Sequence, residues 1–349
     1  SSGALVDLEY YVQLLQVAHG ARVPALRTPR IHEAIAALSG AGVLADEEGG
    51  RLAEAYDFLR RLINGLRMLR GNARDLTLPE ARSDEYIHLA RRMGYRRSDL
   101  GPGRQLFLDF ETLTAEIRAF IERHFGRESL PAAQRGNVAD LILSEDPSRE
   151  LVDHVLRDNG FADTRRAFLN LRRLAGRGER RSAFARLAVL ACDVLRHAAD
   201  PDMALNNWES FAGVLPEVQT HYRLWLSQPR RIEILLTVLA GSQYLSDTLV
   251  RHPDFLDWAT DPAVIGAPRR RAELTADLAG MTGVCGEHAD WLNRLRLFKR
   301  RETLRIGTRD MCLHVPVEEV TADLSMLADA IVEDALAREW MRVKAAGDG

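Results

Sequence analysis

Apolar residues recur every three or four positions along most of the chain, and many of the residues between them are charged. This spacing places the apolar side chains on one face of a helix. The pattern is clearest near the C-terminal end, where it predicts two helices separated by a break at residues 312–316. Their apolar positions are Trp291, Leu295 and Phe298 in the first helix, and Val320, Leu324, Leu327, Ile331 and Ala335 in the second.

The same spacing predicts helices throughout the first 126 residues. The strongest series are Leu8, Val12 and Leu15, then Leu52, Tyr56, Leu59, Ile63 and Leu66, then Phe110, Leu113, Ile117 and Ile121. Helices joined by short connections pack as antiparallel neighbours. Residues 130–137, which include Pro131 and Gly136, form the best candidate boundary. We therefore predict an all-α protein of two consecutive helical bundles, residues 1–130 and 131–349, with little or no sheet.

One short segment, residues 4–9, permits two interpretations. Leu5, Asp7 and Glu9 alternate as in a strand, and a strand would place Asp7 and Glu9 on one face, where they could approach a metal ion. In a helix the two carboxylates point in different directions and would act as helix-capping and salt-bridging acids. The sequence leaves both interpretations open.

Composition narrows the class of protein. Apolar residues make up 46% of the chain and charged residues 28%, as in ordinary soluble proteins. The net charge of −3 gives no overall basic field for nucleic acid. Cys192, Cys285 and Cys312 match no metal or disulfide spacing, which fits a reducing compartment. Since no apolar run approaches the roughly 18 residues of a membrane helix and no signal peptide is recognisable, we expect a cytoplasmic protein with no membrane partner.

Three stretches of the sequence resemble one known family. FKRRETLRIGTRDM and VTADLSMLADA are similar to the helical region before a catalytic domain of the glutamine synthetase adenylyltransferases, and GALVDLEYYVQLLQVAHG is similar to the helical tail that follows such a domain. The resemblance implies a parent protein with two nucleotidyltransferase cores, which transfers AMP from ATP to glutamine synthetase and removes it by phosphorolysis. It also implies magnesium, and regulation by a PII signalling protein with glutamine.

A nucleotidyltransferase core needs a Gly-Ser turn followed by Asp-x-Asp on a strand, because the turn holds the phosphates and the carboxylates hold magnesium. Gly241-Ser242 is followed by Asp247, but the surrounding residues have helical spacing. We therefore expect no catalytic residue, no metal site and no bound cofactor in this chain. Residues 1–130 would follow the first core and residues 131–349 would precede the second. Asp7 and Glu9 match the family's Asp and Glu, so the resemblance makes them candidate accessory residues of the preceding core.

Arg301, Arg305 and Arg309 follow one another at helical spacing, and Asp310 comes next. Three arginines on one face repel one another unless acids lie opposite. The acids of the next helix that could pair with them are Glu318, Asp323 and Asp329. The other interpretation is a surface, including Asp310, that meets the adjoining core, its nucleotide or an acidic partner.

Together these expectations predict a non-catalytic helical linker. It would set the spacing of two catalytic cores and relay which of them is active. We place the switch between the two states near residues 126–137. Its direct partners would be those cores, and glutamine synthetase and the PII protein are partners implied for the parent. The alternative is a free-standing helical scaffold or adaptor whose arginine-rich faces bind an acidic protein. Binding of such a protein by the chain alone, without nucleotide, would favour the scaffold.

Overall fold

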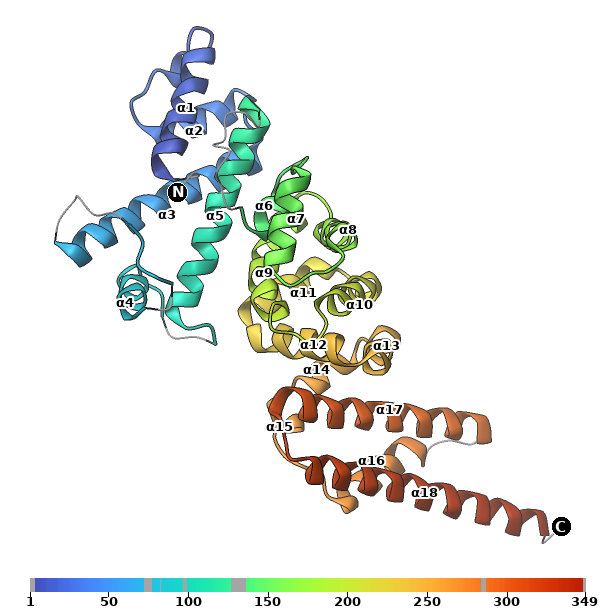
Figure 1. Ribbon diagram of the computed structural model, residues 1–349. Coiled ribbons are helices and arrows are strands. Elements are labelled where there is room, and N and C mark those ends of the chain that lie inside the picture. Colours follow the sequence, from blue (N-terminus) through green and yellow to red (C-terminus); the bar gives the residue numbers. More distant parts are fainter. Residues whose placement is uncertain are drawn as a thin grey trace. The chain divides into compact units, whose positions relative to one another are not determined.

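The structure of the protein is a computed structural model that describes residues 4–71, 77–81, 83–96, 99–126, 136–283 and 287–347. Within these ranges every regular element is a helix and no strand occurs, which confirms the all-α class (Figure 1). Most of the candidate boundary at residues 130–137 lies outside the described residues.

The chain forms two compact units. Unit 1 comprises residues 1–196 and 219–229, and unit 2 comprises residues 197–218 and 230–349. These ranges do not coincide with residues 1–130 and 131–349, whose assignment to the regions after and before catalytic cores stays a prediction.

Unit 1 is built around two long helices, α3 and α5, which pack against each other. Its core joins apolar residues of α1, α2, α3 and α5, among them Leu8, Leu38, Leu59 and Phe120. The helical elements of this unit are α1 (Leu5–His19), η1 (Pro24–Leu26), α2 (Ile31–Gly40), α3 (Asp46–Arg70), α4 (Asp84–Arg92), α5 (Pro102–Phe125), α6 (Val138–Leu143), α7 (Arg149–Asp158), α8 (Thr164–Ala175), α9 (Glu179–Leu195) and most of α11 (Val218–Ser227).

The segment at residues 4–9 is helical, so its interpretation as a strand is wrong. Helix α1 buries Leu5, Leu8, Val12 and Leu15, whose spacing fits one face of a helix. A strand would bury every second residue instead. The alternation of Leu5, Asp7 and Glu9 is therefore incidental to the fold.

Two helices of unit 1 start beside glycines. Gly101 precedes helix α5, and Pro102 takes its first helical position, where proline loses no hydrogen bond. Gly178 precedes α9, and Arg180 and Arg181 belong to the first turn of that helix.

Those two arginines donate hydrogen bonds to carbonyls at helix ends. Arg181 Nη2 donates to the Ser144 carbonyl at 2.7 Å, just after α6, and Arg180 Nε donates to the Leu174 carbonyl of α8 at 3.1 Å. The last carbonyls of a helix lack partners within it, so basic side chains stabilise them.

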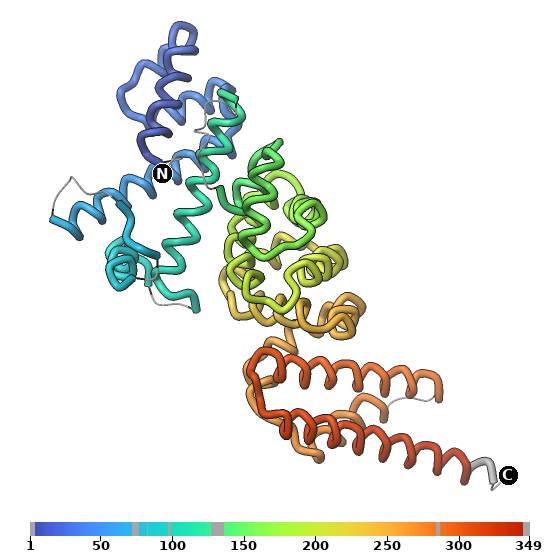
Figure 2. Tube along the Cα trace, in the orientation of Figure 1, coloured from blue at the N-terminus to red at the C-terminus, as the bar shows by residue number. Residues whose placement is uncertain are grey.

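Unit 2 contains α10 (Pro201–Val214), α12 (Pro229–Gly241), α13 (Gln243–Arg251), α14 (Phe255–Ala259), α15 (Pro262–Ile265), α16 (Arg271–Thr282), α17 (His288–Leu313) and α18 (Val317–Gly347). Helices α16, α17 and α18 pack side by side around Leu278, Phe298 and Leu327 (Figure 1). In the trace, α17 and α18 are two long rods joined by a short connection (Figure 2). The two predicted C-terminal helices are thus confirmed, and the break between them spans only residues 314–316.

Gly241-Ser242 is part of this helical packing, as the sequence predicted. Ser242 caps α13, since its hydroxyl accepts a hydrogen bond from the Leu245 amide at 3.3 Å. Leu245 packs against Gly307 of α17, where an added Cβ would lie 2.5 Å from the leucine Cδ1 atom. Glycine at residue 307 therefore lets α13 approach α17 closely.

Candidate functional site

Helix α17 carries a charged cluster where an apolar seam would be expected. Six of its buried residues follow a regular spacing of four and three residues and form one seam: Trp291, Leu295, Phe298, Glu302, Arg305 and Arg309. The first three are apolar and the last three are charged, so the seam changes character halfway along the helix. Arg305 and Glu302 are fully buried, and Arg309 is 2% exposed.

The charged half of the seam faces Asp323 of α18. Arg305 Nε donates to Glu302 Oε2 at 2.8 Å, and Arg305 Nη1 lies 3.4 Å from Asp323 Oδ2. Arg309 Nε lies 3.3 Å from the same Asp323 oxygen, and Arg309 Nη1 donates to the Ile265 carbonyl at 2.8 Å. Unpaired charges are very costly inside a protein, and this arrangement gives each of them a partner.

Further pairs surround this buried cluster. Arg269 bridges Glu302 at 2.8 Å and Asp277 of α16 at 2.7 Å. Arg301 lies 3.3 Å from Asp277, and its guanidinium stacks 4.9 Å from the centre of the Trp258 ring. The cluster thus ties α16, α17 and α18 together.

The arginines predicted as a contact surface are therefore occupied within the protein. Pairing with Asp323, one of the three acids considered from the sequence, is confirmed. Arg305 and Arg309 are buried, and Arg301 keeps only a fifth of its side chain exposed. A contact of these arginines with a nucleotide or a partner stays a prediction. Asp310 is exposed on α17, so a contact role for its side chain stays a prediction.

Asp7 and Glu9, the candidate accessory residues, lie on different sides of α1. Residues two apart in a helix point about 200° apart, so the two carboxylates cannot converge on one ion. Asp7 instead accepts a hydrogen bond from the Ala4 amide at 3.3 Å, at the start of the helix. A contribution of either residue to a neighbouring core stays a prediction.

The sequence interpretation passed over one Asp-x-Asp spacing, at Asp200-Pro201-Asp202. Asp200 caps α10, since its Oδ1 accepts a hydrogen bond from the Met203 amide at 2.8 Å, and Pro201 takes the first helical position. No strand holds this pair. The spacing here is that of a helix start and not of a metal-binding core.

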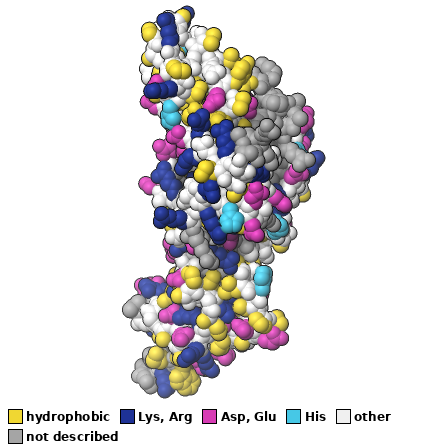
Figure 3. All heavy atoms as spheres, turned by 90° about the vertical axis from the view of Figure 1, so that its left-hand side faces the viewer, with side chains coloured by type: hydrophobic (Ala, Val, Ile, Leu, Met, Phe, Trp, Pro, Cys, Tyr) yellow, Lys and Arg dark blue, Asp and Glu magenta, His cyan; other side chains and the backbone are white. Residues whose placement is uncertain are grey.

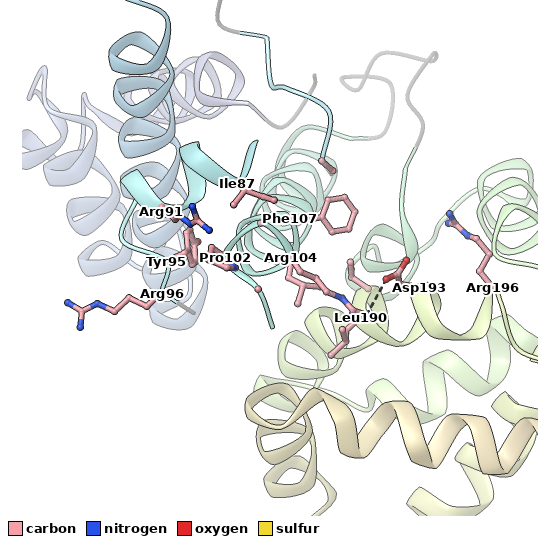
Figure 4. Close-up of a pocket in the computed structure, with 15 residues that line it drawn as sticks. Ile87, Arg91, Tyr95, Arg96, Pro102, Arg104, Phe107, Leu190, Asp193 and Arg196 are labelled. Atoms are coloured by element: carbon pink, nitrogen blue, oxygen red, sulfur yellow. Dashed lines mark ion pairs between the residues drawn. The ribbon is translucent and has the colours of Figure 1, made fainter. Parts of the chain in front are cut away.

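A cavity of about 1230 Å³ opens in unit 1 between α4, α5 and α9 (Figure 4). Its walls include Ile87 of α4, Phe107 of α5 and Leu190 of α9. The start of α5, at Gly101 and Pro102, forms part of its edge, where a helix N-terminus contributes positive potential.

The charged residues that line this cavity are Arg91, Arg96, Arg104, Arg196 and Asp193. Arg104 reaches from α5 to Asp193 of α9 and pairs with it at 3.1 Å, while Arg96 extends away from the cavity (Figure 4). Arg196 Nη2 donates to Asn159 Oδ1 at 3.0 Å. This site could not be recognised in the sequence, because its lining comes from three separate stretches of chain.

A second, smaller cavity of about 310 Å³ in unit 1 is lined by acids and bases of α3, α5 and α9. Glu48 pairs there with Arg123 and accepts from His124 at 3.1 Å, and Glu116 lies 3.3 Å from Arg51. Burial raises the pKa of the Glu116 carboxyl, although Arg51 opposes this shift.

Exposed apolar side chains gather on two helices. Val6, Tyr10 and Val17 share one face of α1, and Val6 and Val17 are 73% and 81% exposed. The far half of α18 has a longer face of this kind, made of Val332, Leu336, Trp340 and Val343. We call these two surfaces the α1 apolar face and the α18 apolar face. Elsewhere, the side of the molecule shown in Figure 3 has basic and acidic side chains interspersed.

Two kinds of feature are absent from the described residues. Among those residues, no group of three or more His, Cys, Asp or Glu side chains is placed to hold a metal ion. No helix in the same part of the chain is long and apolar enough to cross a membrane.

Two family models match separate parts of the sequence. One, described as glutamate-ammonia ligase adenylyltransferase, matches residues 232–348, and the other, described as GlnD PII-uridylyltransferase, matches residues 1–126. No solved structure matches the chain.

Curated relatives match nearly the whole chain. Proteins called bifunctional glutamine synthetase adenylyltransferase/adenylyl-removing enzyme are 29% identical in Xanthobacter autotrophicus and 28% identical in Corynebacterium diphtheriae, over 99% and 97% of this chain. A relative of the same name in Streptomyces avermitilis is 28% identical over 92% of the chain. The matches cover 34%, 32% and 32% of these relatives, so the chain spans about a third of their length. The resemblance seen in the sequence is thereby confirmed.

Proposed function

We propose that this chain is a non-catalytic helical segment of a protein like the bifunctional glutamine synthetase adenylyltransferase/adenylyl-removing enzymes that it matches, and that it connects two nucleotidyltransferase cores. The match to about a third of each relative supports this proposal, because the remaining two thirds leave room for both cores. The all-helical fold supports it as well, since a nucleotidyltransferase site is built on a strand.

The observation that carries the proposal is the position of the exposed apolar surface. The α1 apolar face is close to the N-terminus in sequence and the α18 apolar face is close to the C-terminus. Contiguous exposed apolar patches mark contact surfaces in soluble proteins. On this proposal each face packs against the core that adjoins it, and the helices between them hold the two cores at a defined spacing.

The chemistry of the parent protein would then belong to its cores. The parent would use ATP and magnesium, modify glutamine synthetase in the cytoplasm and respond to a PII signalling protein. Because the described residues include no group placed to hold a metal ion, we derive no magnesium-dependent step for this chain. Its part would be to transmit regulation, which requires two arrangements of the helices with different affinities for the effectors.

An activity assay tests the non-catalytic role. The 349-residue chain is mixed with ATP, magnesium and glutamine synthetase, and separately with phosphate and adenylylated glutamine synthetase. We expect neither adenylylation nor its reversal by mass spectrometry. Adenylylation that is lost in the Asp7→Asn, Glu9→Gln double variant would contradict the proposal.

The coding sequence on either side of this chain tests the connecting role. We expect a Gly-Ser turn and an Asp-x-Asp strand both upstream and downstream. In the complete protein, amide hydrogen exchange should then be slower along residues 332–343 than in the 349-residue chain. Equal exchange in the two proteins, or a stop codon directly after Gly349, would rule out a core packed on α18.

A further inference from the structure

The outer face of helix α8 carries basic side chains for which the connecting role gives no reason. Arg165, Arg166, Leu169 and Arg173 are exposed on this helix, and we call them the α8 basic face. We propose that this face binds an acidic segment of another protein, whose carboxylates meet the arginines and whose apolar side chain meets Leu169. A connecting segment can carry such a face as well as a free-standing protein can, so the proposal does not rest on the connection to catalytic cores.

The spacing of these residues places the arginines around the leucine. Residues three and four apart are neighbours on a helix surface, so Arg165, Arg166 and Arg173 all lie next to Leu169. Helix α8 packs against α6, α7 and α9, and its buried residues, such as Leu171, lie on the opposite side. Leu169 itself is 50% exposed. The face is therefore an apolar contact point with guanidinium groups on both sides along the helix.

The first two arginines of this face are available for binding. Among the described residues, the structure places no hydrogen-bond acceptor or carboxylate against the guanidinium group of Arg165 or Arg166. The sequence itself has five arginines and no acid in residues 164–178. Arg172 on the same helix differs, because its Nη1 donates to the Ser144 carbonyl at 2.7 Å. A carboxylate can therefore bind Arg165 and Arg166 without breaking a contact within the chain.

The position of Arg165 and Arg166 is unfavourable for the helix itself. Both belong to the first turn of α8, where the helix dipole favours acids and disfavours bases. Asp163 caps the helix by accepting a hydrogen bond from the Arg166 amide at 2.9 Å, which does not involve the arginine side chain. The stability of the helix therefore gives no reason for two adjacent arginines here, whereas an acidic partner does.

The extent and composition of the face favour a protein over a small anion or a nucleic acid. Arg165 and Arg173 are eight residues apart, about 12 Å along the helix, so one small anion cannot reach both. A nucleic acid would place phosphates and sugars against Leu169, and the net charge of −3 opposes its approach. An acidic protein segment offers both carboxylates and an apolar side chain, and arginine is enriched where proteins meet.

A synthetic peptide tests the proposal on the 349-residue chain. The peptide is helical and has one leucine with glutamates three and four positions before and after it, and a matched peptide has glutamine in place of each glutamate. We expect the acidic peptide to bind in fluorescence anisotropy, and the glutamine peptide to bind about tenfold or more weakly. Added salt should weaken the binding of the acidic peptide, because exposed charges are screened.

Charge reversal on α8 identifies the surface that binds. The Arg165→Glu, Arg166→Glu double variant should weaken binding of the acidic peptide about tenfold or more, since two attractions become repulsions. Leu169→Ser should weaken it about threefold, because the apolar contact is lost. The matched control is the Arg60→Glu, Arg67→Glu double variant of α3, which changes the net charge equally at exposed arginines outside the α8 basic face. It should bind the peptide at least about threefold more tightly than the α8 double variant does.

Thermal unfolding separates a loss of contact from a loss of structure. A glutamate three residues after Asp163 completes a capping box, and acids in the first turn of a helix are favourable. The Arg165→Glu, Arg166→Glu variant should therefore unfold at the same temperature as the original protein or at a higher one. A loss of binding in that variant then reports the peptide contact.

Three results would overturn the proposal. The first is that the acidic peptide does not bind, or binds no better than the glutamine peptide. The second is that the α8 and α3 double variants lose binding equally, which would show a response to net charge alone. The third is that single-stranded DNA binds the α8 basic face more tightly than the acidic peptide does, which would show a nucleic-acid surface. None of these results touches the connecting role, which is tested by activity and by hydrogen exchange.

Discussion

The arginines of α17 and those around the unit 1 cavity differ in burial and in the acids that lie near them. On α17, Arg305 and Arg309 are buried and paired with Glu302 and Asp323. Around the cavity, Arg91 and Arg196 are exposed, and Asp193 is the one acid among the described lining residues. A run of arginines in a sequence therefore does not reveal a binding surface. Whether arginines form a binding surface depends on whether acids of another helix lie opposite them.

The comparison is sharpest for Glu302, which contacts Arg269, Arg301 and Arg305. Glu302→Gln should lower the free energy of unfolding by about 3–5 kcal/mol, because it removes the negative charge that the buried Arg305 contacts most closely and leaves it only the longer contact with Asp323. Urea denaturation measures this change. Glu319→Gln is the matched control, since Glu319 pairs with Arg309 while half exposed, and should cost at most about 1 kcal/mol. Equal effects of the two changes would show that the α17 cluster is not effectively buried.

Glu116 in unit 1 provides an intermediate case, a buried carboxylate whose pKa is raised despite the nearby Arg51. A carboxyl with a raised pKa in the folded state binds its proton more tightly there than in the unfolded chain. Its contribution to stability is therefore complete below the ordinary pKa of 4.5 and is lost as the pH rises through the folded value.

Glu116→Gln removes this titration. We expect the variant to gain stability relative to the original protein as the pH rises from 4 to 8, measured by thermal unfolding across that range. A difference between the two proteins that does not change with pH would show that solvent reaches the carboxylate. Glu47→Gln, at a more exposed acid of the same small cavity, serves as the control.

A smaller effect is expected at the cavity. Arg104→Ala removes an arginine that pairs with Asp193 near solvent, so it should change the free energy of unfolding by less than about 1 kcal/mol. If urea unfolding shows a loss as large as that for Glu302→Gln, the contrast between the two groups of arginines disappears.

The smallest effect is expected on the α18 apolar face. Leu336→Glu changes a side chain that is 67% exposed, so the stability of the isolated chain should change by no more than about 0.5 kcal/mol. Leu327→Glu is the contrasting variant, because Leu327 is buried against α16 and α17, and it should destabilise strongly. Thermal unfolding compares the two. A large loss for Leu336→Glu would show that this face already has a partner within the chain.

Helices and their buried faces could be predicted from the sequence, because spacing alone decides which side chains share a face. The continuation of the α17 seam into Glu302, Arg305 and Arg309 was present in the same spacing. Pairing of Arg305 and Arg309 with acids of the next helix was one of the two interpretations that the sequence left open, but the burial of Glu302 beside them was not predicted. The contacts of Arg181 with the Ser144 carbonyl and the lining of the cavity could not be predicted, since each joins residues far apart in the sequence.

The unequal halves of the α17 seam restrict how α18 can pack beside it. Sliding α18 by one helical turn away from the loop would bring Asp323 opposite an apolar stretch. Sliding it one turn the other way would place Leu327 among guanidinium groups, and either mismatch is costly. The two helices of this hairpin therefore have a single favoured register. The position of any domain attached after α18, along the helix axis and in rotation about it, would then be determined by a few charged residues about 20 residues earlier in the chain.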